Sequence, residues 1–435
     1  MKDQLCVGFV GMDHLGITSA TGAAEKGWRV ICFDNRNERV AELNNGLVPF
    51  VEPGLKSAIK RNRHLMSFVV DPGELRNCDL VYIALDVPTD STGLSDLQPI
   101  HNLVALVQKH LNDQALMINM CQVPPGFTRA LSHPATTLYY QVETLIFGQA
   151  LDRAVNPERI IIGCNNPCQE LDSKFTKYLD SYSCPLFLMR YESAELAKIS
   201  INLYLAASVS VANTMSELCE KLDADWGEIS PTMKSDRRIG HHAYLKPGLG
   251  ISGGNLERDL RSIVELANSY GTNADVVKSY ISDSEYRKDW VLRSLLNAES
   301  EVTRALTIAV LGLSYKENTA STKNSASVAL LSKISSQKKF QKIAVYDPIV
   351  RVDEIRVDNL VSSTTELEAC QDADAVLIMT PWPQFSCLNP SSIAEVMKGN
   401  LIIDPHSMLS LAKCGDAGLV HYTLGRPPSI SKRLV

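Results

Sequence analysis

The sequence has no long apolar stretch. None of its hydrophobic runs reaches the roughly 18 consecutive residues that a helix needs to cross a lipid bilayer. Residues 1–5 also lack the pattern of a cleaved signal peptide. We therefore expect a cytoplasmic protein with no segment in a membrane.

Runs of positive charge and paired cysteines are absent too. The chain carries 43 basic and 49 acidic residues, a formal net charge of -6, and no Lys/Arg run is long enough for a nucleic-acid patch. Its 11 cysteines are scattered, and Cys164 and Cys168 have no further ligands at a metal spacing. We expect free thiols, no metal and no nucleic-acid partner.

What the sequence contains is apolar material for two or three domains, since 45% of its 435 residues are hydrophobic. Near the start, apolar and β-branched residues 5–10 and 29–33 predict two strands around a helix over 16–26. Asp34 follows at close to the ~20 residues that separate a glycine turn from the acid that binds a ribose 2′-OH. This order predicts a Rossmann unit that binds NAD rather than NADP.

The glycine turn, residues 11–16, is irregular. Gly11 and Gly16 stand where a dinucleotide fingerprint requires glycine, but Asp13 takes the middle position, at which glycine lets the backbone approach pyrophosphate. At ~5 Å and an effective dielectric of ~20, each charge repulsion would cost about 3 kcal/mol. Either Asp13 points away from the phosphates, or the cofactor binds weakly or differently.

A second glycine-rich stretch covers residues 246–259. Gly250 and Gly253 allow the backbone to approach a ligand closely, and Asn255 is predicted to cap a helix that begins at Leu256. Taken alone, the pattern also fits a surface turn followed by a capped helix.

This stretch resembles the P-G-x-G-F-G-G-x-C-x-P-K-D segment of the UDP-glucose and GDP-mannose dehydrogenases, which oxidise the primary alcohol of a nucleotide sugar to a carboxylate with two NAD. The resemblance places Asn255 at the nucleophilic cysteine and Arg258 at the lysine of that segment. A carboxamide is not a useful nucleophile at neutral pH. The covalent step of the second oxidation is therefore excluded at this position.

Further segments of the first half carry the same resemblance. Residues 52–55 (Glu-Pro-Gly-Leu) match a family segment, and Asp86 begins Asp-Val-Pro where the family has Gly-Thr-Pro, which adds a second acid near the cofactor.

Residues 121–126 resemble S-T-V-P-x-G, with Gln122 in place of the active-site threonine. Cys121 is a poor candidate for a relocated nucleophile, because neighbours in a strand point to opposite faces. Residues 140–145 match N-P-E-x-L, with Glu143 at a catalytic acid or base.

The longest helical pattern covers residues 193–221, with Ser193 as its expected N-cap. It matches the family's A-E-x-x-K-x-x-x-N, so Lys198 and Asn202 share one face and are implied to hold a water and the developing alkoxide. Asp259 is expected to pair with Lys198 and set its pKa. The resemblance also implies a homodimer through this helix.

The second half predicts another α/β unit. Residues 236–240 match D-x-R-I-G, which makes Arg238 a candidate for phosphate or uracil contacts. Residues 308–316 resemble V-x-G-L-x-F-K and end in Lys316, and Lys323 replaces an arginine near the cofactor. Residues 404–407 replace D-G-R-N, so that His406 stands at a substrate-binding arginine, and a neutral imidazole cannot make a bidentate contact.

Together these patterns predict an α/β protein with two Rossmann-like, doubly wound parallel-sheet domains joined by a long-helix central domain. The expected domains are residues 1–190, which bind the dinucleotide, 191–297, which hold the long helix and the dimer interface, and 305–435, which bind the nucleotide sugar.

The expected function is an NAD-dependent oxidoreductase that acts on a nucleotide sugar, by default a UDP-linked hexose, and stops after one oxidation or gives an altered product. Two alternatives stay open: a non-catalytic protein that binds a nucleotide sugar, and full oxidation to the acid through an aldehyde hydrate. The candidate catalytic residues are Lys198, Asn202, Asp259, Glu143, Asn255 and Gln122. The candidate cofactor-binding residues are Gly11, Asp13, His14, Leu15, Gly16, Asp34, Arg36, Pro88, Glu143 and Lys323. The candidate substrate-binding residues are Glu143, Lys198, Asn202, Arg238, Gly250, Gly253, Lys316 and His406.

Overall fold

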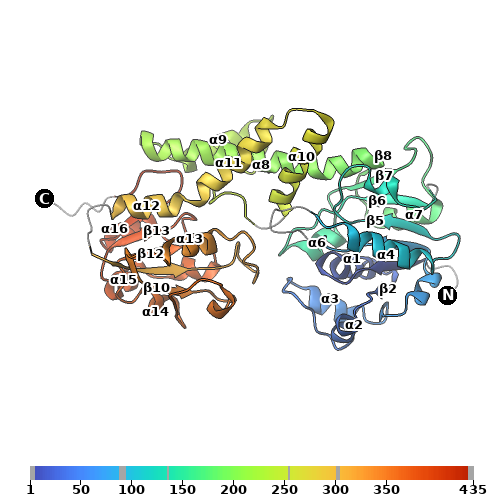
Figure 1. Ribbon diagram of the computed structural model, residues 1–435, viewed down its shortest axis with the longest axis horizontal. Coiled ribbons are helices and arrows are strands. Elements are labelled where there is room, and N and C mark those ends of the chain that lie inside the picture. The colour runs from blue at the N-terminus through green and yellow to red at the C-terminus, as the bar shows by residue number, and fades with distance from the viewer. Residues whose placement is uncertain (1–4, 88–94, 135–136, 253–254, 300–303, 430–435) are drawn as a thin grey trace. The chain divides into compact units, whose positions relative to one another are not determined.

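The computed structural model describes residues 5–87, 95–134, 137–252, 255–299 and 304–429 of the chain. These residues pack into two units, 1–201 and 202–435, and each unit contains one β-sheet covered by helices (Figure 1).

The first unit contains an eight-stranded sheet in the order β3-β2-β1-β4-β5-β6-β7-β8. Its strands are β1 (Cys6–Val10), β2 (Arg29–Phe33), β3 (Met66–Val69), β4 (Leu80–Ile83), β5 (Leu116–Asn119), β6 (Leu138–Gln141), β7 (Ile160–Cys164) and β8 (Leu186–Arg190). Its helices are α1 (His14–Glu25), α2 (Asn37–Asn44), α3 (Leu55–Arg61), η1 (Pro72–Asn77), α4 (Gln98–Gln108), α5 (Phe127–Ala130), α6 (Ala150–Val155) and α7 (Ser173–Asp180). The predicted Rossmann unit is therefore present, and β2 has the predicted bounds.

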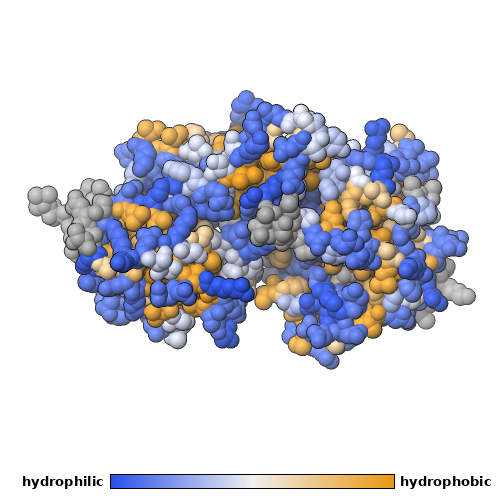
Figure 2. All heavy atoms as spheres, in the orientation of Figure 1, coloured by the Kyte–Doolittle hydropathy of each residue, from blue (hydrophilic) through white to orange (hydrophobic). Residues whose placement is uncertain are grey.

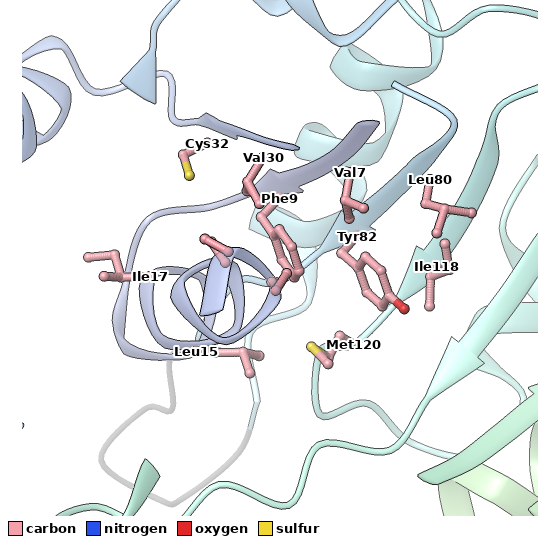
Figure 3. Close-up of a cluster of buried hydrophobic side chains, with 14 of the residues drawn as sticks. Val7, Phe9, Leu15, Ile17, Val30, Cys32, Leu80, Tyr82, Ile118 and Met120 are labelled. Atoms are coloured by element: carbon pink, nitrogen blue, oxygen red, sulfur yellow. The ribbon is translucent and has the colours of Figure 1, made fainter. Parts of the chain in front are cut away.

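The core of this unit forms where α1 packs on β1 and its neighbours. The rings of Phe9 in β1 and Tyr82 in β4 stack with centroids 4.9 Å apart, beside Ile118 and Met120 (Figure 3). Such buried aromatic pairs contribute both apolar area and geometric preference. Leu15 and Ile17 of α1 belong to the same buried cluster, which holds α1 against the sheet.

One strand pair of this sheet departs from the all-parallel expectation. β6 and β7 are antiparallel, whereas every other described pair of the sheet is parallel. A parallel pair needs a crossover, but the chain after β6 instead packs α6 against α1. A Cβ added to Gly22 in α1 would lie 2.8 Å from the Cβ of Ala154 in α6. The chain therefore re-enters the sheet at the end where it left.

The second unit repeats the arrangement with a six-stranded parallel sheet in the order β11-β10-β9-β12-β13-β14. Its strands are β9 (Leu306–Leu311), β10 (Phe340–Tyr346), β11 (Leu360–Ser362), β12 (Ala375–Ile378), β13 (Leu401–Ile403) and β14 (Val420–Tyr422). The helices around it are α13 (Ala326–Ile334), η2 (Val352–Glu354), α14 (Glu366–Cys370), η3 (Pro383–Cys387), α15 (Pro390–Val396) and α16 (Leu411–Asp416). Two parallel-sheet α/β folds, as predicted, are thus confirmed.

A helical segment lies between the two sheets in the sequence. It contains α8 (Tyr191–Leu222), α9 (Trp226–Ser235), α10 (Asn255–Tyr270), α11 (Asp275–Lys288) and α12 (Trp290–Ala298). Helix α8 starts directly after β8, so the predicted N-cap Ser193 was wrong: this residue lies inside the first turn. Within the described part of the chain, no helix has both the length and the apolar character that a membrane crossing requires.

Candidate functional site

The turn between β1 and α1 has the backbone geometry of a dinucleotide fingerprint. Gly11 has φ +95° and donates its N–H to the carbonyl of Phe33 at 2.9 Å. A Cβ on Gly16 would come 1.7 Å from the carbonyl oxygen of Gly11, so that α1 can approach β1 only with glycine there. The turn lies between β1 and β4, where the strand order reverses and ligands of this fold bind.

Asp34 lies at the end of β2 and is almost completely buried. Its Oδ2 accepts a hydrogen bond from the Met12 amide at 2.7 Å, and both of its oxygens accept from the Arg36 guanidinium at 2.8 and 2.7 Å. Burial acts to raise the pKa of Asp34, but the hydrogen bonds from Arg36 and the Met12 amide outweigh it and lower that pKa. Asp34 is therefore an anion that ties β2 to the glycine turn.

The charge of Asp13 is balanced by the same guanidinium. Arg36 Nη2 lies 2.8 Å from Asp13 Oδ1 and 2.7 Å from Asp34 Oδ2. The backbone of Asp13 is extended, with φ -98° and ψ -163°, so its conformation does not require glycine. The Asp13 carboxylate is thus engaged by Arg36.

His14, the first residue of α1, is held by two acids. Its amide donates to Asp86 Oδ2 at 3.1 Å, and its Nε2 lies 3.2 Å from Glu52 Oε2. Its ring stacks on Phe147 with centroids 4.0 Å apart. Glu52 also accepts the amides of Gly148 and Ala150 at 3.0 and 2.8 Å. The sequence predicted residues 52–55 as a matched segment. It could not predict the partners of Glu52, because His14, Gly148 and Ala150 are far from it in the sequence.

Glu143 and Lys198 lie together in the first unit. Lys198 Nζ donates to the Glu143 carbonyl at 2.9 Å and lies 3.4 Å from its carboxylate. Both side chains are mostly buried, at 12% and 18% exposed. The carboxylate of Glu143 also accepts the Leu145 amide. A cation and a carboxylate are thus fixed beside each other by backbone contacts.

The loop that carries Gln122 is fixed by a carboxylate that sequence analysis did not single out. Glu195 of α8 is fully buried and accepts the amides of Gly126 and Thr128 at 2.6 and 2.8 Å. Cys121 is buried in the same segment, and burial raises its pKa to about 12. A thiol of this kind stays protonated at neutral pH, which argues against a nucleophilic role.

In the second unit, Asn202 and Asp259 form a pair. Asn202 Nδ2 donates to Asp259 Oδ2 at 2.5 Å, and Arg258 Nε lies 3.5 Å from Asp259 Oδ1. Asp259 is 2% exposed and Arg258 6%. Asn255, which the resemblance is expected to align with the family's cysteine, is the first residue of α10, one position before the predicted start.

The glycine-rich loop before α10 is attached to two helices of this unit. The Gly248 amide donates to Asn213 Oδ1 in α8 at 2.8 Å, and the Ile251 amide donates to Ser284 Oγ in α11 at 2.7 Å. Gly250 has φ +78°, and a Cβ there would lie 2.4 Å from the Ser284 carbonyl oxygen. Loop and helices therefore fix one another.

Most of the remaining candidates belong to the second unit. Arg238 is 88% exposed and paired with Asp236 at 2.6 Å, Lys316 lies 5.8 Å from the Tyr315 ring centroid, and Lys323 is exposed. Burial lowers the pKa of His406, whose Nε2 lies 3.1 Å from the Met379 carbonyl. Leu15 is buried in the first unit. Pro88 and Gly253 lie outside the described residues.

Comparison with known proteins identifies the fold and the family. Three models of the UDP-glucose/GDP-mannose dehydrogenase family match consecutive parts of the chain: the NAD binding domain at residues 5–178, the central domain at 192–284 and the UDP binding domain at 309–410. The chain belongs to this family.

Relatives of this dehydrogenase match over nearly its whole length. It is 27% identical to UDP-glucose 6-dehydrogenase TuaD of Bacillus subtilis, over 97% of this chain and 93% of that protein. It is 26% identical to UDP-glucose 6-dehydrogenase of Rickettsia typhi, over 96% and 98%. The solved UDP-glucose dehydrogenase of Pyrobaculum islandicum superposes with a TM-score of 0.83 at 25% identity, over 97% and 98%. The predicted class, an NAD-dependent nucleotide-sugar dehydrogenase that acts on CH–OH, is confirmed.

The contact between Asp13 and Arg36 predicts that substitutions of these two residues have non-additive effects on NAD binding. Replacing Arg36 with Ala should weaken NAD binding about five-fold more in the wild type than in an Asp13→Gly background, because the loss of Arg36 exposes the charge of Asp13 only where Asp13 is present. Calorimetric titration of the four proteins with NAD measures this difference. Equal losses in both backgrounds would show that Arg36 does not compensate Asp13.

The contacts that hold the glycine-rich loop against α8 and α11 predict that alanine substitutions at two glycines differ in their effect on stability. Gly250→Ala should lower the free energy of unfolding by about 2 kcal/mol or more, because the added methyl group overlaps the backbone of Ser284. Gly271→Ala is the matched control, since Gly271 also has a positive φ, +65°, with nothing within 4 Å of its added Cβ. Urea denaturation compares the two variants. Similar losses of unfolding free energy would contradict the close packing of Gly250 on Ser284.

Proposed function

We propose that this enzyme oxidises a nucleotide sugar once, without a covalent thiol intermediate. The observation that supports the proposal is that Lys198–Glu143 and Asn202–Asp259 are hydrogen-bonded pairs. The resemblance places Asn255 where the family uses a cysteine. The groups proposed for the first oxidation would then be present, and the nucleophile for the second would be missing.

The first unit would hold the cofactor. NAD, when bound, accepts the hydride that leaves the substrate carbon. Residues at the glycine turn and the end of β2 would bind and orient it: Gly11, Asp13, His14, Leu15, Gly16, Asp34 and Arg36. Pro88, Glu143 and Lys323 are further proposed contacts. A buried acid at the end of β2, a positive φ at Gly11 and the tight contact at Gly16 support this assignment.

Lys198 and Glu143 would handle the proton of the substrate hydroxyl. As the C–H bond breaks, the hydroxyl proton must pass to a base, and Glu143 is the proposed acceptor. The ammonium of Lys198, held by the Glu143 carbonyl at 2.9 Å, would stabilise the negative charge that develops on the oxygen. Gln122 would orient water in the same region.

The second unit would supply the substrate contacts. Asn202 is oriented by Asp259, so that its carboxamide oxygen is available to accept from a sugar hydroxyl. Gly250 and Gly253 would let the loop backbone approach the sugar, and Arg238, Lys316 and His406 would face its phosphates and base. UDP-linked hexose is the proposed substrate, because the matched C-terminal model is a UDP binding domain and the relatives named above act on UDP-glucose.

The stoichiometry of NADH tests this proposal. With UDP-glucose and excess NAD, we expect one NADH for each sugar consumed and a product at the aldehyde or ketone level by mass spectrometry. Two NADH and a carboxylate would contradict the proposal and favour oxidation through an aldehyde hydrate. No NADH and no consumption of sugar, with binding intact, would show a non-catalytic protein.

Restoring sulfur should restore the second oxidation. Asn255→Cys is expected to raise the yield towards two NADH per sugar, since a thiolate can add to the aldehyde, and to make that second step sensitive to iodoacetamide. Asn255→Ser is the control of similar size with a weak nucleophile. A second NADH from the serine variant as well would remove sulfur from the explanation.

We further propose a homodimer built on α8. Exposed apolar side chains recur along this helix at intervals of three, four and seven residues, at Tyr204, Val211, Met215, Leu218 and Leu222. This spacing places them on one face. The opposite face carries Asn213 and Glu217, which bond to the glycine-rich loop and to α11. Apolar side chains also reach the surface in the region of α8 and α9 (Figure 2).

Introducing a charge into this apolar face should dissociate the dimer. Leu218→Glu is expected to give a monomer by light scattering at micromolar concentration, because a carboxylate would be buried without a partner. Lys221→Glu, exposed on the flank of the same helix, is the matched control and should remain dimeric. A Leu218→Glu protein that keeps the wild-type mass would exclude this face as the interface.

A further inference from the structure

Asp86 lies at the start of α1, where a dinucleotide binds its pyrophosphate in this fold. It follows β4, the strand beside β1 at the point where the strand order reverses. Its Oδ2 accepts the amide of His14, the first residue of α1, at 3.1 Å. A carboxylate thus already uses one of the N–H groups that a phosphate oxygen would use.

The backbone on both sides of Asp86 is fixed. The Leu85 amide donates to Cys121 Sγ at 3.3 Å, and the Val87 side chain packs in the core below β4 and β5. An aspartate side chain is short, so Asp86 cannot move far from the helix terminus when a ligand arrives. Its side chain keeps solvent access, and it therefore faces any anion that binds there.

The charges around Asp86 do not compensate it well. The titratable groups that act on it are His14 and Asp13 at the start of α1, and Glu143 after β6. Glu52 engages the His14 ring, and Arg36 is already shared by Asp13 and Asp34. Although Asp86 is partly exposed, the protein packed around its carboxylate removes part of its hydration and raises its pKa to about 6; His14 opposes this shift, and Asp13 and Glu143 add to it. At pH 7.5 the carboxylate is largely ionised, and an approaching pyrophosphate would add two further negative charges.

We propose that Asp86 takes up a proton when the dinucleotide binds, and that this residue makes cofactor affinity depend on pH. The neutral acid can donate a hydrogen bond to a phosphate oxygen, whereas the ionised form repels it. The inference rests on the proposed cofactor site in the first unit. Binding that raises the pKa of an acid is favoured as the pH falls, so the affinity for NAD increases from pH 8 to pH 6.

Calorimetric titration with NAD and with ADP-ribose tests this inference on the full chain. ADP-ribose carries the pyrophosphate but no nicotinamide, so it reports binding without turnover. For the wild type we expect tighter binding at pH 6 than at pH 8. We also expect net proton uptake at pH 7.5, measured from the heats in buffers of different ionisation enthalpy.

Asp86→Asn is the decisive variant, because its carboxamide keeps the hydrogen bond to the His14 amide and cannot ionise. It should bind both ligands roughly ten-fold more tightly than the wild type at pH 8 and show little proton uptake. Asp86→Ala should behave similarly if charge, rather than the hydrogen bond, is what matters. Both variants retain His14, so a pH dependence that survives in them belongs to other groups.

Two results would overturn the role of Asp86, and a third would contradict the cofactor site on which it rests. Unchanged affinity and unchanged proton uptake in Asp86→Asn would exclude the role of Asp86, as would tighter wild-type binding at pH 8 than at pH 6. Failure of every protein to bind NAD or ADP-ribose at any pH would instead contradict the proposed cofactor site itself.

Discussion

The interaction on which the proposed cofactor site depends is the contact of one guanidinium with two carboxylates. Arg36 lies within hydrogen-bonding distance of both Asp13 and Asp34, and Asp34 in turn holds the amide of Met12. Without the cation, the Asp13 carboxylate would stand uncompensated at the N-terminus of α1, where the pyrophosphate is proposed to bind. Arg36, three residues after β2, supplies the counter-charge for this irregular fingerprint.

Helix α8 plays a comparable part in the helical segment. Its inward face carries Lys198, Asn202 and Asn213, each hydrogen-bonded to a loop or helix that contains a proposed site residue. Its outward face is the apolar stripe proposed to bind a second copy. One continuous helix therefore carries residues proposed for catalysis, for the position of the glycine-rich loop and for assembly.

Much of the fold could be predicted from the sequence, and each prediction that was wrong or missing has a physical reason. Strand β2 was predicted to the residue, because an apolar run between a helix and an acid is a local pattern. The antiparallel pairing of β6 and β7 was not, since a strand's composition does not reveal its direction. The engagement of Asp13 by Arg36, and of Glu52 by His14, depends on residues brought together by folding. The predicted cap at Ser193 was wrong because nothing local in the sequence indicates that α8 begins directly after β8.

The proposed function requires that hydride transfer is retained in this enzyme while the sulfur chemistry of the second oxidation is lost. The most direct measurement is carbon NMR of the reaction with UDP-glucose whose sugar is fully ¹³C-labelled. We expect one sugar carbon at the aldehyde, hydrate or ketone level and no carboxylate signal. A carboxylate at carbon 6, formed by the wild-type protein alone, would contradict it.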